Sequence, residues 1–316
     1  MTFMAFQGSM ELGIIYAIMA LGVFISFRTL NMPDLTVDGS FTLGAACSAI
    51  CCSLGHPLLG IGLALLAGAI AGSVTASLHT KLKIQPLLAG ILVMLALYSV
   101  NLRVMAGRAN IALVNKTTVF RFISGNTMEQ YAGVIIPSIV LLMALLFLFW
   151  FLQTRFGMVL RATGDNDQMV RALGVNTDTT ILIGLALSNS LVALSGALIA
   201  QYQSFADISM GVGMVVIGLA SVIIGEVLFG TKSLLRRLIA VTLGAILYRL
   251  IIAIALEMGM PATDLKLISA LIVALALSAP VIKERLAAIK KRYFTKIKNA
   301  WRRLIKRYFI RKGAPL

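Results

Sequence analysis

Four charged residues interrupt otherwise apolar stretches of the chain: Asp38, Asp207, Glu226 and Arg249. A charge inside a membrane is costly, so the charges that a spanning segment keeps often line a solute or ion path. Gly39 follows Asp38 and allows a local break in a helix, whose positive end can then face an anionic group such as a carboxylate. We therefore take Asp38, Gly39, Asp207, Glu226 and Arg249 as candidates for a translocation pathway. The alternative is structural, with Arg249 paired to Glu226 from a neighbouring span.

The chain lacks the sequence patterns of the common enzyme sites. Gly230-Thr-Lys-Ser233 resembles a fragment of a Walker A phosphate loop, but its lysine does not follow a second glycine as that motif requires. Neither Gly-x-Ser-x-Gly nor His-Glu-x-x-His occurs. The three cysteines, Cys47, Cys51 and Cys52, fall in one apolar stretch, where small soft side chains ordinarily pack between helices. We expect a protein that is not an enzyme and that binds no metal or cofactor itself.

One long polar segment, residues 161 to 176 (RATGDNDQMVRALGVN), separates apolar stretches in the middle of the chain. We expect Gly164 to end the preceding helix, and Asp165 or Asn166 to cap a new one. Residues 167 to 173 then hold one or two turns, with Met169, Val170 and Leu173 forming a small apolar face and Arg161 and Arg171 flanking it. Gly174 suits the left-handed position that ends a helix. A helix this short is marginal in water, which favours docking against a partner, and the alternative is a plain connecting loop.

The elements that position these residues are transmembrane helices. Only 13% of the 316 residues are charged and 59% are hydrophobic, whereas about 25% are charged in a soluble domain. A bilayer core needs about 20 apolar residues per helix. The sequence predicts an all-α polytopic membrane protein with about nine spans: Leu12 to Phe27, Leu35 to Leu54, Leu58 to Leu78, Ile84 to Val100, Val134 to Leu152, Ile181 to Ala200, Val212 to Phe229, Leu238 to Leu256, and Leu265 to Ile282.

The distribution of charge predicts the orientation. Residues 283 to 316 hold 13 Lys and Arg and one acid, and by the positive-inside rule this tail is cytoplasmic. Counting back through nine spans places residues 154 to 180 inside and the amino terminus outside. Apolar residues recur every three or four positions along Lys283 to Lys312, which predicts a basic amphipathic helix on the inner leaflet rather than a nucleic-acid-binding segment. We divide the chain into a membrane domain, 1 to 282, and this tail.

Two patterns predict how the spans pack. Asp34-Leu-Thr-Val-Asp-Gly39 and Asp207-Ile-Ser-Met-Gly-Val212 precede similar Gly- and Ala-rich spans, and an odd number of spans separates them, as in an inverted repeat. Small residues also recur along two spans and form grooves for close helix contact. They are Gly60, Ala64, Gly68, Gly72 and Ala76 in one span, and Gly184, Ser188, Gly196 and Ala200 in another.

The polar segment and the amino-terminal run together carry a family resemblance. Residues 157 to 176 resemble the cytoplasmic loop of ABC importer permeases of the branched-chain amino-acid and ribose family. Residues 31 to 45 (NMPDLTVDGSFTLGA) resemble a subgroup associated with aromatic amino acids and related solutes. In this family the loop carries a coupling helix that docks in a groove of the ATPase subunit. Many relatives have a pair of small residues where this chain has Arg171-Ala172. The resemblance assigns ATPase coupling to Arg161, Gly164, Asp165, Asn166, Arg171, Ala172, Leu173 and Gly174.

The resemblance implies the permease subunit of a bacterial ABC importer in the inner membrane. Such a subunit forms a homodimer, receives a small solute, an amino acid or a related compound, from an extracytoplasmic binding protein, and is driven by two separate ATPase subunits that use ATP. The alternative is a self-sufficient secondary transporter or channel, in which Asp38, Glu226 and Arg249 would couple an ion gradient.

Overall fold

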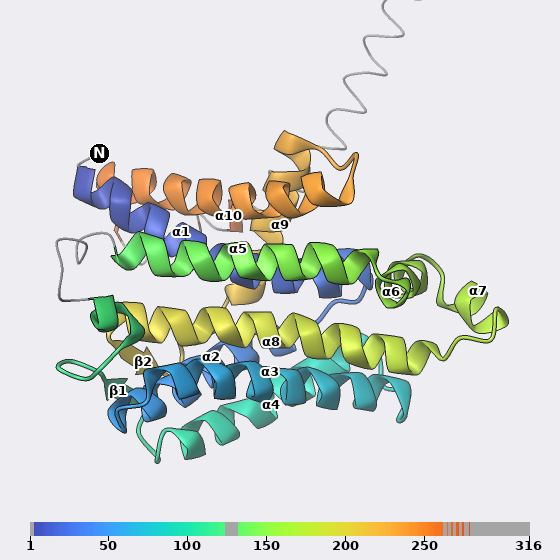
Figure 1. Ribbon diagram of the computed structural model, residues 1–316, viewed down its shortest axis with the longest axis horizontal. Coiled ribbons are helices and arrows are strands. Elements are labelled where there is room, and N and C mark those ends of the chain that lie inside the picture. Colours follow the sequence, from blue (N-terminus) through green and yellow to red (C-terminus); the bar gives the residue numbers. More distant parts are fainter. Residues whose placement is uncertain are drawn as a thin grey trace, which may run out of the picture. The chain divides into compact units, whose positions relative to one another are not determined.

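The computed structural model describes residues 3–123 and 132–261, and six single positions between 264 and 278. All the elements below belong to one compact unit, Met1–Val273. In chain order they are α1 (Phe3–Val23), the π-helix η1 (Phe24–Thr29), α2 (Thr36–Ser53), α3 (Pro57–Thr80), α4 (Pro86–Val104), β1 (Asn110–Ala112), the 3₁₀-helix η2 (Val119–Ile123), α5 (Ala132–Gln153), α6 (Arg155–Asp165), α7 (Asp167–Ala172), α8 (Thr177–Gln203), β2 (Phe205–Asp207), α9 (Met214–Phe229) and α10 (Leu234–Glu257). The long helices run alongside one another, with β1 and β2 at one end and α6 and α7 at the other (Figure 1).

The predicted spans coincide with helices. Within the described residues, six helical stretches are long and apolar enough to cross a membrane: α1 with η1, α3, α4, α5, α8 and α10. Two further predicted spans form the shorter helices α2 and α9. The all-α polytopic prediction is confirmed, since eight predicted spans each match one of these helices. Of the ninth, Leu265 to Ile282, the structure describes only five single positions, and the basic tail lies outside the described residues.

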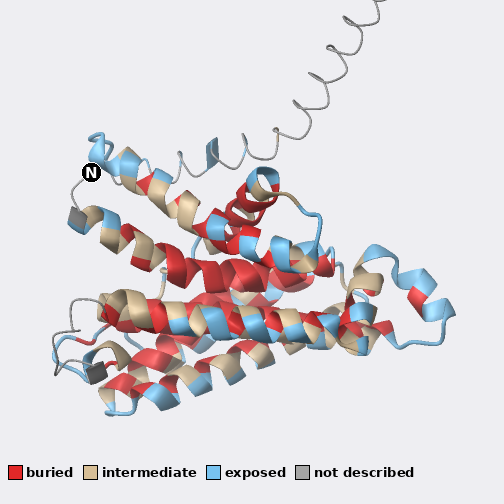
Figure 2. Cartoon of the chain, turned by 45° about the horizontal axis from the view of Figure 1, so that its top comes forward, coloured by how far each residue is buried: buried red, intermediate tan, exposed pale blue. Residues whose placement is uncertain are grey.

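Burial follows the pattern of a membrane protein, in which apolar residues occupy both the interior and the surface. Helices α1 and α8 are the most buried of the six spans, and α3, α4 and α5 are the least. Apart from Gln153 at its end, the exposed residues of α5 are apolar. Four of them, Ile139, Leu142, Leu146 and Trp150, are spaced three or four apart on one helix face. Figure 2 shows such exposed stripes along the peripheral helices. In a soluble protein this surface would be polar, so lipid tails are the medium that suits it.

The predicted small-residue groove joins α3 to α8. A Cβ atom added to Gly72 would lie 2.1 Å from the Leu185 carbonyl oxygen, and one added to Gly68 would lie 2.4 Å from that of Asn189. The two backbones therefore approach as closely as glycine allows. The row on α8 serves a different neighbour, because a Cβ at Gly196 would meet the Phe41 carbonyl of α2 at 2.0 Å. Helix α8 thus uses separate small residues to approach α2 and α3.

A short two-stranded sheet closes the end opposite α7. Strand β1 pairs antiparallel with β2, with Asn110 opposite Asp207. The strands pack with the last turns of α2 and with α8 in one apolar cluster that includes Ala49, Ile111 and Ala206. The composition, dominated by long apolar runs, gave no indication of these strands. Their role is local: they anchor the chain just before it turns back toward α9.

Candidate functional site

Asp38 joins the amino-terminal ends of two short helices. It lies in the first turn of α2, and its carboxylate accepts hydrogen bonds from the backbone N–H of Gly213 at 2.9 Å and of Val215 at 2.8 Å. These amides begin α9, where four N–H groups have no partner within the helix. The opposite end of α2 packs beside β2, whereas α9 ends near Arg28 of η1. The two segments of the predicted repeat therefore meet at their starts, and each runs from there toward a different end of the molecule.

A cavity of about 230 Å³ opens beside this junction. Asp38 and Gly39 line it, together with Tyr98 and Asn101 of α4 and Val212 before α9. Asn101 is buried and its amide donates to the Gly39 carbonyl oxygen at 3.2 Å. The cavity wall is mostly apolar, and its polar side chains are one carboxylate, one phenol, one amide and the hydroxyl of Thr42. Such a combination suits a small amphipathic solute.

Asp207 lies elsewhere. Its carboxylate accepts hydrogen bonds from the Ser209 hydroxyl and from the Ser209 N–H at 2.8 Å, and Asn110 donates to it at 3.4 Å. These hydrogen bonds, the Ser209 hydroxyl first, lower the pKa of Asp207 below its ordinary value. The side chain stabilises the turn that follows β2, and it does not line the cavity beside Asp38.

Glu226 and Arg249 do not pair with each other. The nearly buried Glu226 of α9 accepts from both the Nε (2.7 Å) and the Nη2 of Arg28. Arg249 of α10 instead lies over the ring of Tyr16, 5.5 Å from its centroid, a cation–π contact. The structural alternative, in which Arg249 pairs with Glu226, is therefore wrong. The sequence could not identify the true partner, because Arg28 is 198 residues away along the chain.

Asp34 is buried and its carboxylate holds two helices together. It is 1% exposed and accepts from the Thr36 N–H at 2.9 Å and from the Asn189 amide at 2.7 Å. It thereby orders the start of α2 and ties it to α8. Asn189, like Arg28 and Asn101, was not among the residues singled out in the sequence, since a single polar residue in an apolar span carries no pattern of its own.

The polar segment folds as two helices, and one expectation about it is wrong. Gly164 does not end a helix; it lies inside α6, which continues to Asp165. A Cβ at this position would lie 1.9 Å from the Thr29 carbonyl oxygen, so the glycine allows α6 to pack against the end of η1. A glycine in a helical pattern can mark either a break or a close approach, and only the neighbouring element distinguishes the two.

Helix α7 has the boundaries that the sequence predicts. Asn166 caps it, its side-chain oxygen accepting from the Met169 N–H at 3.0 Å, and Gly174 follows with φ of 81°. Arg171 donates to the Thr177 hydroxyl at 2.5 Å and to the Asp178 carboxylate at 2.9 Å, and so fixes α7 to the first turn of α8. Leu173 is 73% exposed, so this apolar side chain has little cover. The helix projects beyond the ends of the long spans (Figure 1).

The comparisons with known proteins identify the family. The family described as "Branched-chain amino acid transport system / permease component" matches residues 6–277. A tyrosine transport system permease protein of Clostridioides difficile is 40% identical over 84% of this chain and 87% of its own length. A ribose import permease of Escherichia coli K12 is 28% identical over 73% and 71%, and a probable branched-chain amino acid permease of Methanocaldococcus jannaschii is 24% identical over 70% and 74%. No solved structure matches. The chain therefore belongs to this family of multi-pass membrane permeases, the permease components of ABC importers.

Proposed function

We propose that this chain works as a homodimer, imports a small amino-acid-like solute, and is driven by two separate ATPase subunits that contact α7. The observation that carries the proposal is the short, doubly capped helix α7, with Met169 and Leu173 exposed at its surface. Six residues do not form a stable helix in water by themselves. An apolar groove on a partner would cover these side chains and hold the helix.

The solute is proposed to be an aromatic amino acid or a similar compound, delivered by an extracytoplasmic binding protein. The tyrosine permease named above is 40% identical to this chain over 265 aligned residues, which cover most of both lengths. The cavity beside Asp38 supports the proposal, because Tyr98 and apolar side chains could contact a ring while Asn101 and Asp38 contact polar groups. Glu226 and Arg249 remain pathway candidates only in a conformation that opens their present contacts.

Orientation is part of the same proposal. Helix α1 begins at the end of the bundle opposite α7 (Figure 1). With the α7 end inside, where the ATP-using subunits act, the amino terminus would be extracytoplasmic. The basic tail would then be cytoplasmic, as its charge predicts.

A secondary transporter remains the alternative class of function, and the geometry gives it less support. Ion coupling by Asp38, Glu226 and Arg249 would require them to share a site. Asp38 binds the start of α9, Glu226 binds Arg28, and Arg249 lies over Tyr16. The three charged groups therefore lie at three separate sites, each with its own partner.

The test is to place a charge on α7 with Leu173→Asp. A Leu side chain buried in a partner's groove contributes about 1.5–3 kcal/mol, so we expect the ATPase subunit to bind roughly ten- to a hundredfold more weakly. Leu82→Asp is the matched control, since Leu82 is 66% exposed, lies in the loop between α3 and α4, and is proposed to face the same side. ATPase retention and solute-stimulated hydrolysis would be measured in lipid nanodiscs. Normal retention and transport in Leu173→Asp would refute α7 as the coupling helix.

A further inference from the structure

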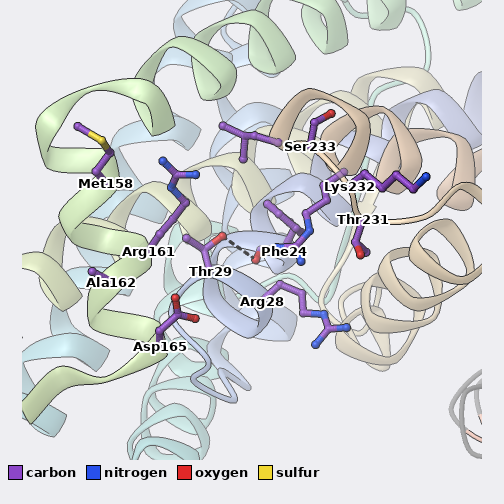
Figure 3. A pocket seen from close by; sticks show the side chains of 12 residues that line it. Phe24, Arg28, Thr29, Met158, Arg161, Ala162, Asp165, Thr231, Lys232 and Ser233 are labelled. Atoms are coloured by element: carbon purple, nitrogen blue, oxygen red, sulfur yellow. Dashed lines mark hydrogen bonds between the residues drawn. The ribbon is translucent and has the colours of Figure 1, made fainter. Parts of the chain in front are cut away.

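A second, larger cavity lies at the α7 end of the bundle. Its volume is about 490 Å³, and its walls are formed by η1, α6, the loop between α9 and α10, and the start of α10. Figure 3 shows Arg161, Ala162 and Asp165 on one side and Thr231, Lys232 and Ser233 on the other. It is separate from the cavity beside Asp38, with which it shares no lining residue. The proposed import function does not require this cavity to hold anything.

The wall of this cavity is strongly cationic. Arg28, Arg161, Lys232 and Arg237 line it, against the single carboxylate of Asp165. Arg28 is neutralised by Glu226. Among the described residues, no ion pair joins Arg161, Lys232 or Arg237 to a carboxylate. Three cations therefore share one space with little compensating charge.

Two of these cations also have unsatisfied donors. The Nε atoms of Arg161 and Arg237 are buried and have no hydrogen-bond partner within the described part of the chain. A buried donor without an acceptor is destabilising, and more so on a charged group. An anion in the cavity would offset the positive charge that these two arginines bring to its wall.

The loop between α9 and α10 adds features that favour a phosphate group in particular. Gly230 has φ of 78° and is followed by Thr231, Lys232 and Ser233. Ser233 caps the 24-residue helix α10, its hydroxyl accepting from the Arg236 N–H at 3.3 Å. Glycine, lysine and a hydroxyl directly before a helix start are the groups that hold phosphates in other proteins, and the positive end of the helix dipole adds to them. Unlike a Walker A loop, this one lacks the glycines that would surround a nucleotide.

We infer that this cavity binds a phosphate group. Arginine recognises phosphate through parallel N–H donors, and lysine adds a point charge. The phosphate could belong to an anionic phospholipid headgroup or to a soluble phosphate compound. A lipid would also use the apolar wall, to which Phe24 and Met158 belong, and Met158 is 50% exposed.

The experiment compares two charge-matched double variants of the full chain. Lys232→Gln with Arg237→Gln removes two cavity cations, and Lys81→Gln with Lys83→Gln removes two cations from the loop between α3 and α4, outside this cavity. Retained phosphatidylglycerol would be counted by native mass spectrometry from mixed phosphatidylglycerol and phosphatidylcholine micelles. Orthophosphate binding would be measured by calorimetry in a neutral detergent. We expect the cavity variant to lose at least about tenfold in affinity for one probe, and the control variant to lose little.

A second measurement uses the unaltered chain, so it does not depend on the folding of the cavity variant. It asks whether a ligand protects the Lys232 amine from an acylating reagent. Protection by phosphatidylglycerol alone supports a lipid site, and protection by orthophosphate supports a soluble ligand. Equal binding by both double variants, or no protection by either probe, would overturn the inference. Protection by the ATPase subunit alone would also overturn it, because the cavity would then be a protein contact.

Discussion

The close contact between α3 and α8 can be tested with two glycines on one helix. Gly72 of α3 faces the Leu185 carbonyl oxygen, and an added Cβ would lie 2.1 Å from that oxygen and 2.7 Å from the Leu185 carbonyl carbon. Gly62, ten residues earlier, has nothing within 4 Å of an added Cβ. Alanine at either position gains the same helix propensity, about 1 kcal/mol. The two substitutions therefore differ only in what the new methyl group meets.

The two substitutions are expected to change the stability of the protein in opposite directions. Gly62→Ala should leave the protein unchanged or stabilise it by up to about 1 kcal/mol. In Gly72→Ala the helices must move apart by roughly 1 Å to relieve the overlap, and forcing extra atoms into a packed interface costs typically about 1–3 kcal/mol or more. The loss spreads along the interface because Gly68, one turn earlier, also lies close to α8, with an added Cβ 2.4 Å from the Asn189 carbonyl oxygen.

Thermal unfolding of the two purified variants in one detergent would measure the difference. About 1 kcal/mol shifts the midpoint by roughly 2–4 °C in a protein of 150–250 residues, and somewhat less in a longer chain. We expect Gly72→Ala to unfold several degrees below the wild type and Gly62→Ala to unfold at or slightly above it. A Gly72→Ala midpoint at or above that of Gly62→Ala would refute the close backbone approach.

Three further predictions concern the charged residues and the orientation. Arg28→Gln should destabilise the fold by about 1–3 kcal/mol, because it leaves the buried Glu226 carboxylate without its half-exposed partner. Adding Glu226→Gln should recover much of the loss when both variants are compared by denaturant unfolding. Asp38→Ala should cost more stability than Asp38→Asn. Alanine leaves two amides at the start of α9 unpaired, at about 1–3 kcal/mol each, whereas asparagine keeps one acceptor. Equal losses would argue that Asp38 does not cap α9. In a variant without the native cysteines, Thr117→Cys should react with an impermeant thiol reagent applied outside cells and Gln168→Cys should not, and the reverse result would invert the orientation.

Local patterns in the sequence predicted local structure well. The apolar runs predicted eight helices because lipid exposure and core packing both require the same kind of side chain. The boundaries of α7 followed from Asn166 and Gly174, whose capping roles depend on a few neighbouring residues. Contacts between distant segments were not predictable in this way. The partner of Glu226 and the cap that Asp38 provides to α9 join residues 198 and 175 to 177 apart in sequence.

Gly164 and the two strands are local features that the sequence did not predict correctly. A glycine inside a helix costs about as much free energy as a capping residue would gain, so helix propensity does not decide where Gly164 lies. Its position inside α6 depends on the Thr29 carbonyl that lies against it. Strands β1 and β2 contain three residues each, and within the described part of the chain they pair with each other alone. Segments so short hold too little periodicity to predict a strand.

The bond between α7 and α8 has a mechanical consequence. Arg171 holds α7 to Thr177 and Asp178, so a force on α7 acts on the first turn of a 27-residue helix. That helix is packed against α1, α2 and α3, and Asn189 near its middle binds Asp34 at the start of α2. A rigid rod held at its centre transmits displacement of one end to the other with the direction reversed. A push on α7 would therefore tilt the far end of α8, beside the strands, in the opposite sense, with the Asp34–Asn189 contact as the pivot.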